Sequence, residues 1–197
     1  MRLDLVVGSN GAGKTTFIEL TLVSSLPPGT AIVNADAIAR QRWGTDPEAK
    51  SYDAAKVAEA TRNALIEARL PFVAETVFSH ESKLELIESA QHAGFTVVLH
   101  ILLVPEELTV SRVEHRVAAG GHSVPETKIR GRYDRLWRLV AQAARGCDLA
   151  TVYDNSADRG PRPVARAAGG LATGAAEWPT WTPTDLRYGW PPDLGGD

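Results

Sequence analysis

The segment from Gly8 to Thr15 constrains the fold more than any other part of this 197-residue chain. It reads Gly-Ser-Asn-Gly-Ala-Gly-Lys-Thr and fits the pattern GxxxxGK[S/T] at every fixed position. The apolar run 3–7 precedes it, and a segment with helical character, 14–24, begins inside it. A strand, a glycine-rich turn and a helix in this order predict a phosphate-binding loop, because the loop amides and the helix N-terminus then face an anion.

We expect this loop and the first helical turn to bind a nucleoside triphosphate through Gly8, Ser9, Asn10, Gly11, Ala12, Gly13, Lys14, Thr15 and Thr16. Lys14 is expected to reach the β- and γ-phosphates and to take part in catalysis, and the Thr15 hydroxyl is expected to ligate Mg²⁺. The alternative is a glycine-rich turn that binds nothing. The strand before the motif and the helix after it favour triphosphate binding.

Short apolar runs alternate with helical patterns along most of the chain. The predicted strands are 3–7, 31–34, 71–74, 95–104 and 149–153, and the predicted helices are 14–24, 46–69, 80–93, 106–119 and 123–144. Strands that are apolar on both faces and separated by helices predict a doubly wound α/β fold with a mostly parallel sheet of five or six strands. Such sheets bind ligands at the carboxyl ends of their strands.

Acidic residues follow two of these strands on the side expected to hold the phosphates. The strand 95–104 ends in Val104-Pro105 without an acid, which argues against the Mg²⁺-binding strand of a motor or switch NTPase. Asp36 is the candidate base and acceptor ligand, because transfer to a hydroxyl needs a carboxylate to take its proton. Glu75 would bind the acceptor, together with Thr76, or support Mg²⁺ through water. The alternatives are a helix N-cap for Asp36 and a solvated loop acid for Glu75.

Arginines are concentrated late in the chain. The segment 112–145 holds seven of the 16 arginines, and its eight basic and three acidic residues give a formal charge of +5. It covers two predicted helices joined by Gly120-Gly121-His122, which together predict a helical lid over the triphosphate. Arg112 and Arg116 share a helix face and are candidates to act on the transferring phosphoryl group, while Arg132 and His122 are candidates to bind the nucleotide. A solvated helix face is the alternative for each arginine.

Composition limits the partners and the compartment. The formal charge of −3 argues against a nucleic-acid partner. The single cysteine, Cys147, excludes an internal disulfide and fits a reducing cytosol. The longest apolar run, 95–105, is too short to span a bilayer and contains His100. We therefore expect a cytoplasmic protein without a membrane partner.

The motifs described above, in the order in which they occur, resemble those of the zeta-toxin family of P-loop kinases, and especially its small single-domain bacterial members. The segments that carry the resemblance are 8–16, 34–38, 75–76, residue 112, 120–126, 129–133 and 153–156, within residues 3–156. The resemblance implies a P-loop kinase that uses ATP and Mg²⁺ to phosphorylate a hydroxyl of UDP-N-acetylglucosamine, and an antitoxin protein that blocks the nucleotide site.

By this resemblance Lys14 and Thr15 bind the phosphates and Mg²⁺, Asp36 is the base, Glu75 binds the acceptor sugar and Arg112 contacts the γ-phosphate. The toxins carry a second lid arginine where this chain has His122, and Arg116, Arg130 and Arg132 are the candidates to replace it.

The sequence thus predicts an ATP- and Mg²⁺-dependent kinase for a small-molecule hydroxyl, over residues 1–156. The alternatives are a kinase for another acceptor, such as a sugar, an antibiotic or a polynucleotide end, and a regulatory nucleotide-binding module without turnover. Residues 157–197, rich in Pro, Gly and Trp, are expected to form a C-terminal extension with one added strand at most. Residues 153–156, after the last predicted strand, either line an adenine pocket or make a turn.

Overall fold

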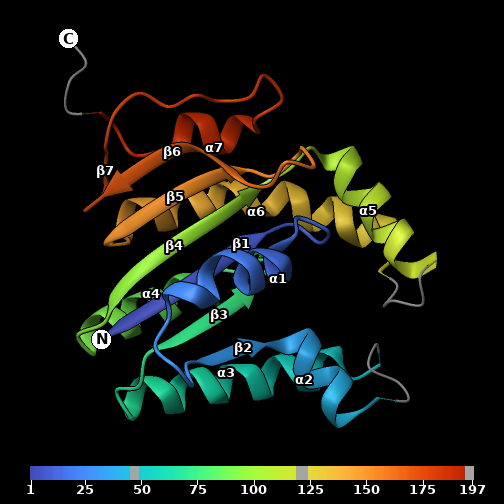
Figure 1. Ribbon diagram of the computed structural model, residues 1–197, viewed down its shortest axis with the longest axis vertical. Helices are drawn as coiled ribbons and strands as arrows, with labels where there is room; N and C mark the ends of the chain where they lie inside the picture. The colour runs from blue at the N-terminus through green and yellow to red at the C-terminus, as the bar shows by residue number, and fades with distance from the viewer. Residues whose placement is uncertain (45–48, 119–123, 194–197) are drawn as a thin grey trace.

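A seven-stranded sheet forms the centre of the computed structural model, which describes residues 1–44, 49–118 and 124–193 (Figure 1). The strand order is β2-β3-β1-β4-β5-β6-β7. The strands are β1 (Arg2–Gly8), β2 (Ala31–Asn34), β3 (Phe72–Thr76), β4 (Thr96–Leu103), β5 (Leu149–Asp154), β6 (Arg162–Ala168) and β7 (Leu171–Ala172). Strands β1 to β5 are parallel, whereas β6 and β7 are antiparallel to their neighbours. The predicted mostly parallel sheet is confirmed, with seven strands in place of five or six.

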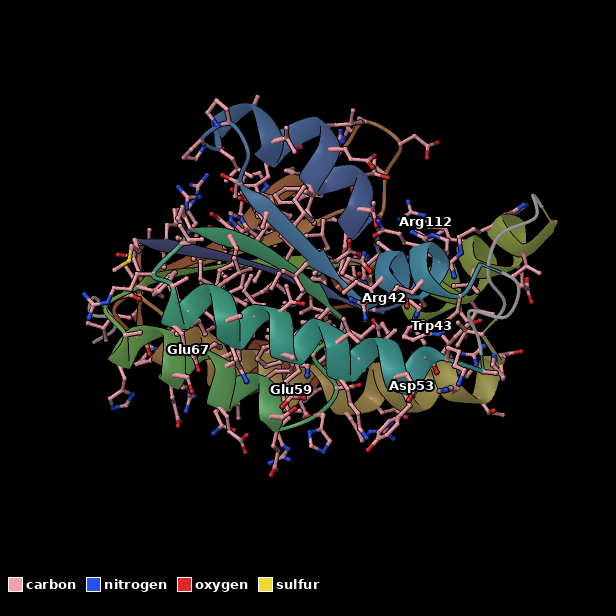
Figure 2. All side chains as sticks on the ribbon, turned by 90° about the horizontal axis from the view of Figure 1, so that it is seen from below. Arg42, Trp43, Asp53, Glu59, Glu67 and Arg112 are labelled. Carbon is pink, nitrogen blue, oxygen red and sulfur yellow. The ribbon has the colours of Figure 1, made fainter. Side chains whose placement is uncertain are left out.

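Helices cover both faces of this sheet. They are α1 (Lys14–Phe17), α2 (Ala35–Arg42), α3 (Ser51–Glu67), α4 (Ser82–His92), α5 (Glu106–Ala118), α6 (Glu126–Gly146) and α7 (Thr184–Gly189). Helix α1 continues as a π-helix and then a 3₁₀ turn up to Ser25. Figure 2 shows α1 on one side of the sheet and α3, α4 and α6 on the other. The predicted helix start at residue 46 lies outside the described residues. Helix α2 was considered only through the alternative role of Asp36, as the N-cap of a helix from Ala37, and it begins two residues earlier.

Side chains of β1 show why its sequence is apolar throughout. Leu3, Leu5 and Val7 are fully buried in the large core formed with α3, α4 and α6. Val6 points the other way and packs in a second core with Phe17 of α1. A parallel strand buried on both faces has no solvent face and therefore shows no alternation of polar residues. No helix in the described ranges is both long and apolar enough to cross a membrane.

An ionisable pair is buried between β1 and β4, beneath α1. The Asp4 carboxylate, 1% exposed, lies 2.8 Å from Nε2 of His100 and also accepts a hydrogen bond from Arg2. Burial acts to raise the pKa of Asp4, but the hydrogen bonds and charges of His100 and Arg2 outweigh it and hold that pKa below its ordinary value. The ionised form of Asp4 therefore stabilises the fold.

The residues after 156 extend the same sheet and core. Beyond β7 the chain follows the outer edge of β6, where Thr173 N–H donates to Arg166 O at 2.9 Å and Glu177 N–H donates to Val164 O at 2.7 Å. Helix α7 packs on α6, with Leu186 fully buried. The expected single added strand is thus accompanied by a second strand and a helix. The domain boundary near residue 156 stays a prediction.

Candidate active site

A cleft of about 700 Å³ opens at the carboxyl ends of β1, β2 and β3. Its floor contains the loop after β1, Asp36 at the start of α2 and Glu75 at the end of β3. Residues of α3 and the segment 77–83 line one side, and residues of α5 and α6 line the other. This is the edge at which parallel α/β sheets bind ligands.

The loop requires glycine at two positions. Gly11 and Gly13 have φ angles of 77° and 84°, a region that side chains other than glycine rarely adopt. A Cβ on Gly13 would lie 2.6 Å from Nδ2 of Asn155, and one on Gly11 would lie 2.9 Å from Thr109 O. The Ser9 and Thr109 hydroxyls are 2.9 Å apart, so α5 also holds the loop in place.

Lys14 is positioned inside the loop. Its Nζ donates hydrogen bonds to Gly8 O at 3.1 Å and to Ser9 O at 2.8 Å, and the residue is 8% exposed. Burial lowers the pKa of Lys14, while the nearby charges of Glu75 and Asp36 act to raise it. The ammonium group is therefore oriented by the loop and lies within the field of both acids on the cleft floor.

A hydrogen-bonded chain joins Thr15, Glu75 and Asn34. The Thr15 hydroxyl donates to the Glu75 carboxylate at 3.0 and 3.1 Å, and Asn34 Nδ2 donates to the same carboxylate at 2.6 Å. Asn34 Oδ1 accepts from the N–H groups of Asp36 and Ala37 and so caps α2. The alternative role of Asp36 as the N-cap is therefore wrong, since Asn34 takes it. Asn34 was not predicted as a helix cap, although an Asn before a helix is a strong cap signal.

The Thr15 hydroxyl and the Glu75 carboxylate are suitable ligands for Mg²⁺, which binds hydroxyl and carboxylate oxygens together with phosphate and water. Thr15 and Glu75 offer such oxygens side by side at the mouth of the loop. No cluster of three or more His, Cys, Asp or Glu able to hold a metal occurs in the described part of the chain.

The cleft is strongly cationic, with eight Lys or Arg residues and two acids along its lining. Those from α5 and α6, which we call the lid, are Arg112, Arg116, Lys128 and Arg132. Arg132 Nη1 donates to Asn10 Oδ1 of the loop at 3.4 Å. Figure 2 shows Arg112 at the same end of the molecule as Arg42 and Trp43, which lie at the end of α2. The predicted lid arginines therefore gather around the loop.

Two other predicted lid features have different outcomes. Arg130 lies within 3.1 Å of three carboxylates, those of Glu106, Glu107 and Glu126, and does not line the cleft. It is thus the least suitable of the three arginines considered to replace a missing lid arginine. Gly120-Gly121-His122, and with them His122 as a nucleotide ligand, lie outside the described residues.

Residues 153–156 support the loop and do not line the cleft. Asn155 Nδ2 donates to Ala12 O at 2.8 Å, and Arg112 Nη1 donates to Asn155 O at 3.0 Å. Asp154 Oδ1 accepts from the N–H and the hydroxyl of Ser156, which closes a turn. Of the two roles considered, the geometry favours the turn.

Three basic residues from α2, α3 and α4 line the cleft but were not predicted as site residues. They are Arg40 of α2, Arg62 of α3 and Lys83 of α4. Arg62 was not predicted as a site residue because it lies on the buried face of its helix, at four-residue spacing from Ala58 and Ile66. A basic residue at a position where the helical period demands an apolar one was the available signal.

Comparison with known proteins identifies relatives over most of this chain. The family model described as AAA domain matches residues 3–139. An uncharacterized protein of Haemophilus influenzae is 27% identical over 127 residues, which are 64% of this chain and 88% of that protein.

Solved structures resemble the fold. The AvrRxo1-ORF1:ORF2 complex with ATP gives a TM-score of 0.68 at 17% identity, over 87% of this chain and 60% of the AvrRxo1 chain. The PezAT toxin–antitoxin system of Streptococcus pneumoniae gives 0.59 at 15% identity, over 96% and 84%. Shikimate kinase from Acinetobacter baumannii gives 0.51 at 19% identity, over 73% and 80%. At these identities the likeness shows a P-loop kinase-like fold.

Proposed function

This chain belongs to the AAA domain family, and from that premise and the geometry of the cleft we propose that it is a P-loop phosphotransferase. It uses ATP and Mg²⁺ and phosphorylates a hydroxyl group of a small molecule. The observation that carries the proposal is the position of Asp36. This carboxylate lines the same cleft as the phosphate-binding loop, and its charge acts on both Lys14 and Arg132, where it opposes the lowering of the pKa that burial causes.

The loop and the lid hold the donor. When bound, ATP supplies the phosphoryl group, and Mg²⁺ neutralises part of its charge. The amides of residues 8–13 and the Lys14 ammonium bind phosphate oxygens. Arg112 and Arg116 reach the cleft from α5, and a guanidinium fork stabilises the charge that spreads over the transferring group. Thr15 and Glu75 would hold Mg²⁺, Thr15 by its hydroxyl and Glu75 through water.

Asp36 prepares the acceptor. Its carboxylate accepts the proton of the acceptor hydroxyl as that oxygen forms a bond to the γ-phosphorus and the bond from that phosphorus to the β–γ bridging oxygen breaks. Asn34 fixes the backbone of Asp36 through its cap, and so keeps the base at the end of β2. Thr76 lies in the same lining as Asp36 and contributes to the acceptor side.

The acceptor class follows the resemblance to the zeta toxins. We propose a sugar nucleotide such as UDP-N-acetylglucosamine as the first acceptor to examine, and an antitoxin protein as the partner that would silence the enzyme. The PezAT neighbour supports this proposal by being a toxin–antitoxin system. An enzyme that uses ATP in this way would act in the cytoplasm.

Two substitutions test the proposal. Asp36→Asn should leave ATP affinity within about twofold of wild type and lower phosphoryl transfer by roughly 10²–10⁴-fold. Lys14→Ala should weaken ATP binding itself. Asp53→Asn, on α3 outside the cleft, is the matched control and should retain the wild-type rate (Figure 2). The readouts are ATP titration and a mass-spectrometric search for metabolites that gain one phosphate. Transfer by Asp36→Asn at the wild-type rate would refute the role of the base.

A further inference from the structure

Arg62 is a buried cation without a sufficient partner. It is 6% exposed, lies midway along α3 and lines the cleft. Its Nε is buried and has no hydrogen-bond partner among the residues that the structure describes. No ion pair joins Arg62 to a carboxylate of the described residues, although Glu59, exposed on the same helix, contributes a favourable charge at longer range (Figure 2). Burying a guanidinium in this way is costly, so a ligand that pairs with it would recover much of the cost.

A second cation lies near Arg62. Lys83, in the first turn of α4, also lines the cleft and is half-buried. Burial lowers the pKa of Lys83, and the nearby Arg62 charge lowers it further. Its Nζ donates to Ser82 Oγ at 3.3 Å and forms no ion pair within the described ranges. Two neighbouring cations that repel each other gain most from a shared anion.

The positions of these cations separate them from the donor side. Arg112, Arg116 and Arg132 belong to the lid, and Arg132 contacts Asn10 of the loop, whereas Arg62 and Lys83 come from α3 and α4, the helices that precede and follow β3. The strand order places β3 between β1, which carries the loop, and β2, which leads to Asp36. A group bound by Arg62 and Lys83 would therefore belong to the acceptor and not to the triphosphate.

We propose that Arg62 and Lys83 form an anion-binding subsite, so that the acceptor carries an anionic group, a phosphate or a carboxylate, in addition to its reactive hydroxyl. The inference rests on the proposed function, since it names the class of acceptor for that reaction. Neutral alcohols lack the group that would pair with Arg62 and are poor acceptors. Ser79 and His80 also line the cleft, just before α4 in the chain.

The test is anion binding to protein that already holds a nucleotide. Wild type is saturated with Mg²⁺ and a non-hydrolysable ATP analogue, so that the loop is filled, and inorganic phosphate or acetate is then titrated while backbone amide resonances are followed. We expect saturable shifts in the segment 77–84 and in α3 around Arg62. Stronger binding of phosphate indicates a phosphorylated acceptor, and stronger binding of acetate indicates a carboxylated one, and either result supports the subsite.

Substitutions identify the residues responsible. Arg62→Gln should raise the dissociation constant of the anion by about 10- to 100-fold, because hydrogen bonds to a charged group are lost. Arg62→Lys should retain part of the affinity. Lys83→Gln provides a variant at a half-buried position, in case Arg62→Gln does not fold, and should weaken anion binding by about 3- to 30-fold. Lys56→Gln removes a charge from the same helix outside the cleft and should change anion binding by less than about twofold.

Two results would overturn the subsite. One is the absence of saturable shifts in wild type up to about 50 mM phosphate or acetate, and the other is unchanged anion affinity in both Lys83→Gln and a folded Arg62→Gln. In both cases nucleotide binding, read from the amides of residues 8–16, remains intact. Failure of the nucleotide itself to bind would refute the proposed function along with the subsite, so the two failures are distinguishable.

Discussion

The pairing of Glu75 with Thr15 leads to a prediction in which one substitution has opposite effects on ATP affinity with and without metal. Glu75→Gln retains the shape of the side chain and removes its charge. Without Mg²⁺, the Glu75 carboxylate repels the triphosphate that would lie beside Thr15 and Lys14. We therefore expect Glu75→Gln to bind ATP as tightly as wild type or more tightly when Mg²⁺ is chelated.

With Mg²⁺ the expected effect reverses. The Glu75 carboxylate accepts hydrogen bonds from Thr15 and, at 2.6 Å, from Asn34. The amide in Glu75→Gln has only one accepting oxygen, so it retains these contacts only in part. Losing one charge-assisted contact in the metal-bound state costs about 1.5–3 kcal/mol, or about 10- to 150-fold in the Mg²⁺ concentration needed for half-maximal ATP binding.

The assay is a titration with a fluorescent ATP analogue at a series of Mg²⁺ concentrations, from chelated to saturating. Glu67→Gln, at the far end of α3, is the control and should follow wild type in both conditions (Figure 2). Equal weakening by Glu75→Gln with and without Mg²⁺ would refute the reasoning and indicate a structural role. Unchanged binding in both conditions would refute it as well and would assign Glu75 to the acceptor.

Two further predictions concern stability. Gly13→Ala places a Cβ 2.6 Å from Asn155 Nδ2 at a φ of 84°, whereas Gly29→Ala at a φ of 79° meets no atom within 4 Å. In urea denaturation Gly13→Ala should lower the free energy of unfolding by about 2–4 kcal/mol and Gly29→Ala by about 1–2 kcal/mol. Equal losses would show that the contact with Asn155 does not destabilise the folded protein. Asp4→Asn should destabilise the protein at pH 7 by about 1–3 kcal/mol through its contact with His100. Because the pKa of Asp4 is lowered on folding, its contribution is fully present above the unfolded value of about 4 and is lost as the pH falls through the folded pKa. Thermal unfolding from pH 2 to 7 should show the difference between Asp4→Asn and wild type shrinking below about pH 4, and a constant difference would contradict the role of the charge.

Local sequence signals predicted the parts of the site that depend on the order of elements along the chain. The loop at Gly8–Thr15 and the acids Asp36 and Glu75 lie at strand ends, and a parallel sheet brings such ends to one edge. The role of Asn34 depends on a cross-strand hydrogen bond to Glu75. The sequence carries the cap signal but not that pairing. Whether Asp36 and Glu75 perform the predicted chemistry stays a prediction.

The meaning of other features depends on tertiary packing, even where the sequence carries a local signal. Arg62 lies on an apolar helix face, and a role in ligand binding is suggested only by the structure, which shows that this face borders the cleft. Helix α7 has six residues between prolines and shows no helical period, and its position depends on Leu186 and Trp190 packing into the core shared with α6. Short helices of this kind derive their stability from tertiary contacts, so helix propensity and hydrophobic periodicity do not predict them.

The course of residues 171–177 has a consequence for the behaviour of the protein at high concentration. Exposed sheet edges offer free backbone groups to which other chains can add, which is a common route to aggregation. Here β7 and the hydrogen bonds from Thr173 and Glu177 occupy much of the outer side of β6, and the opposite edge, β2, is only four residues long. Residues 171–177 thus protect the edge of β6 from pairing with other chains. Truncating the chain before them would expose that edge and favour association between molecules.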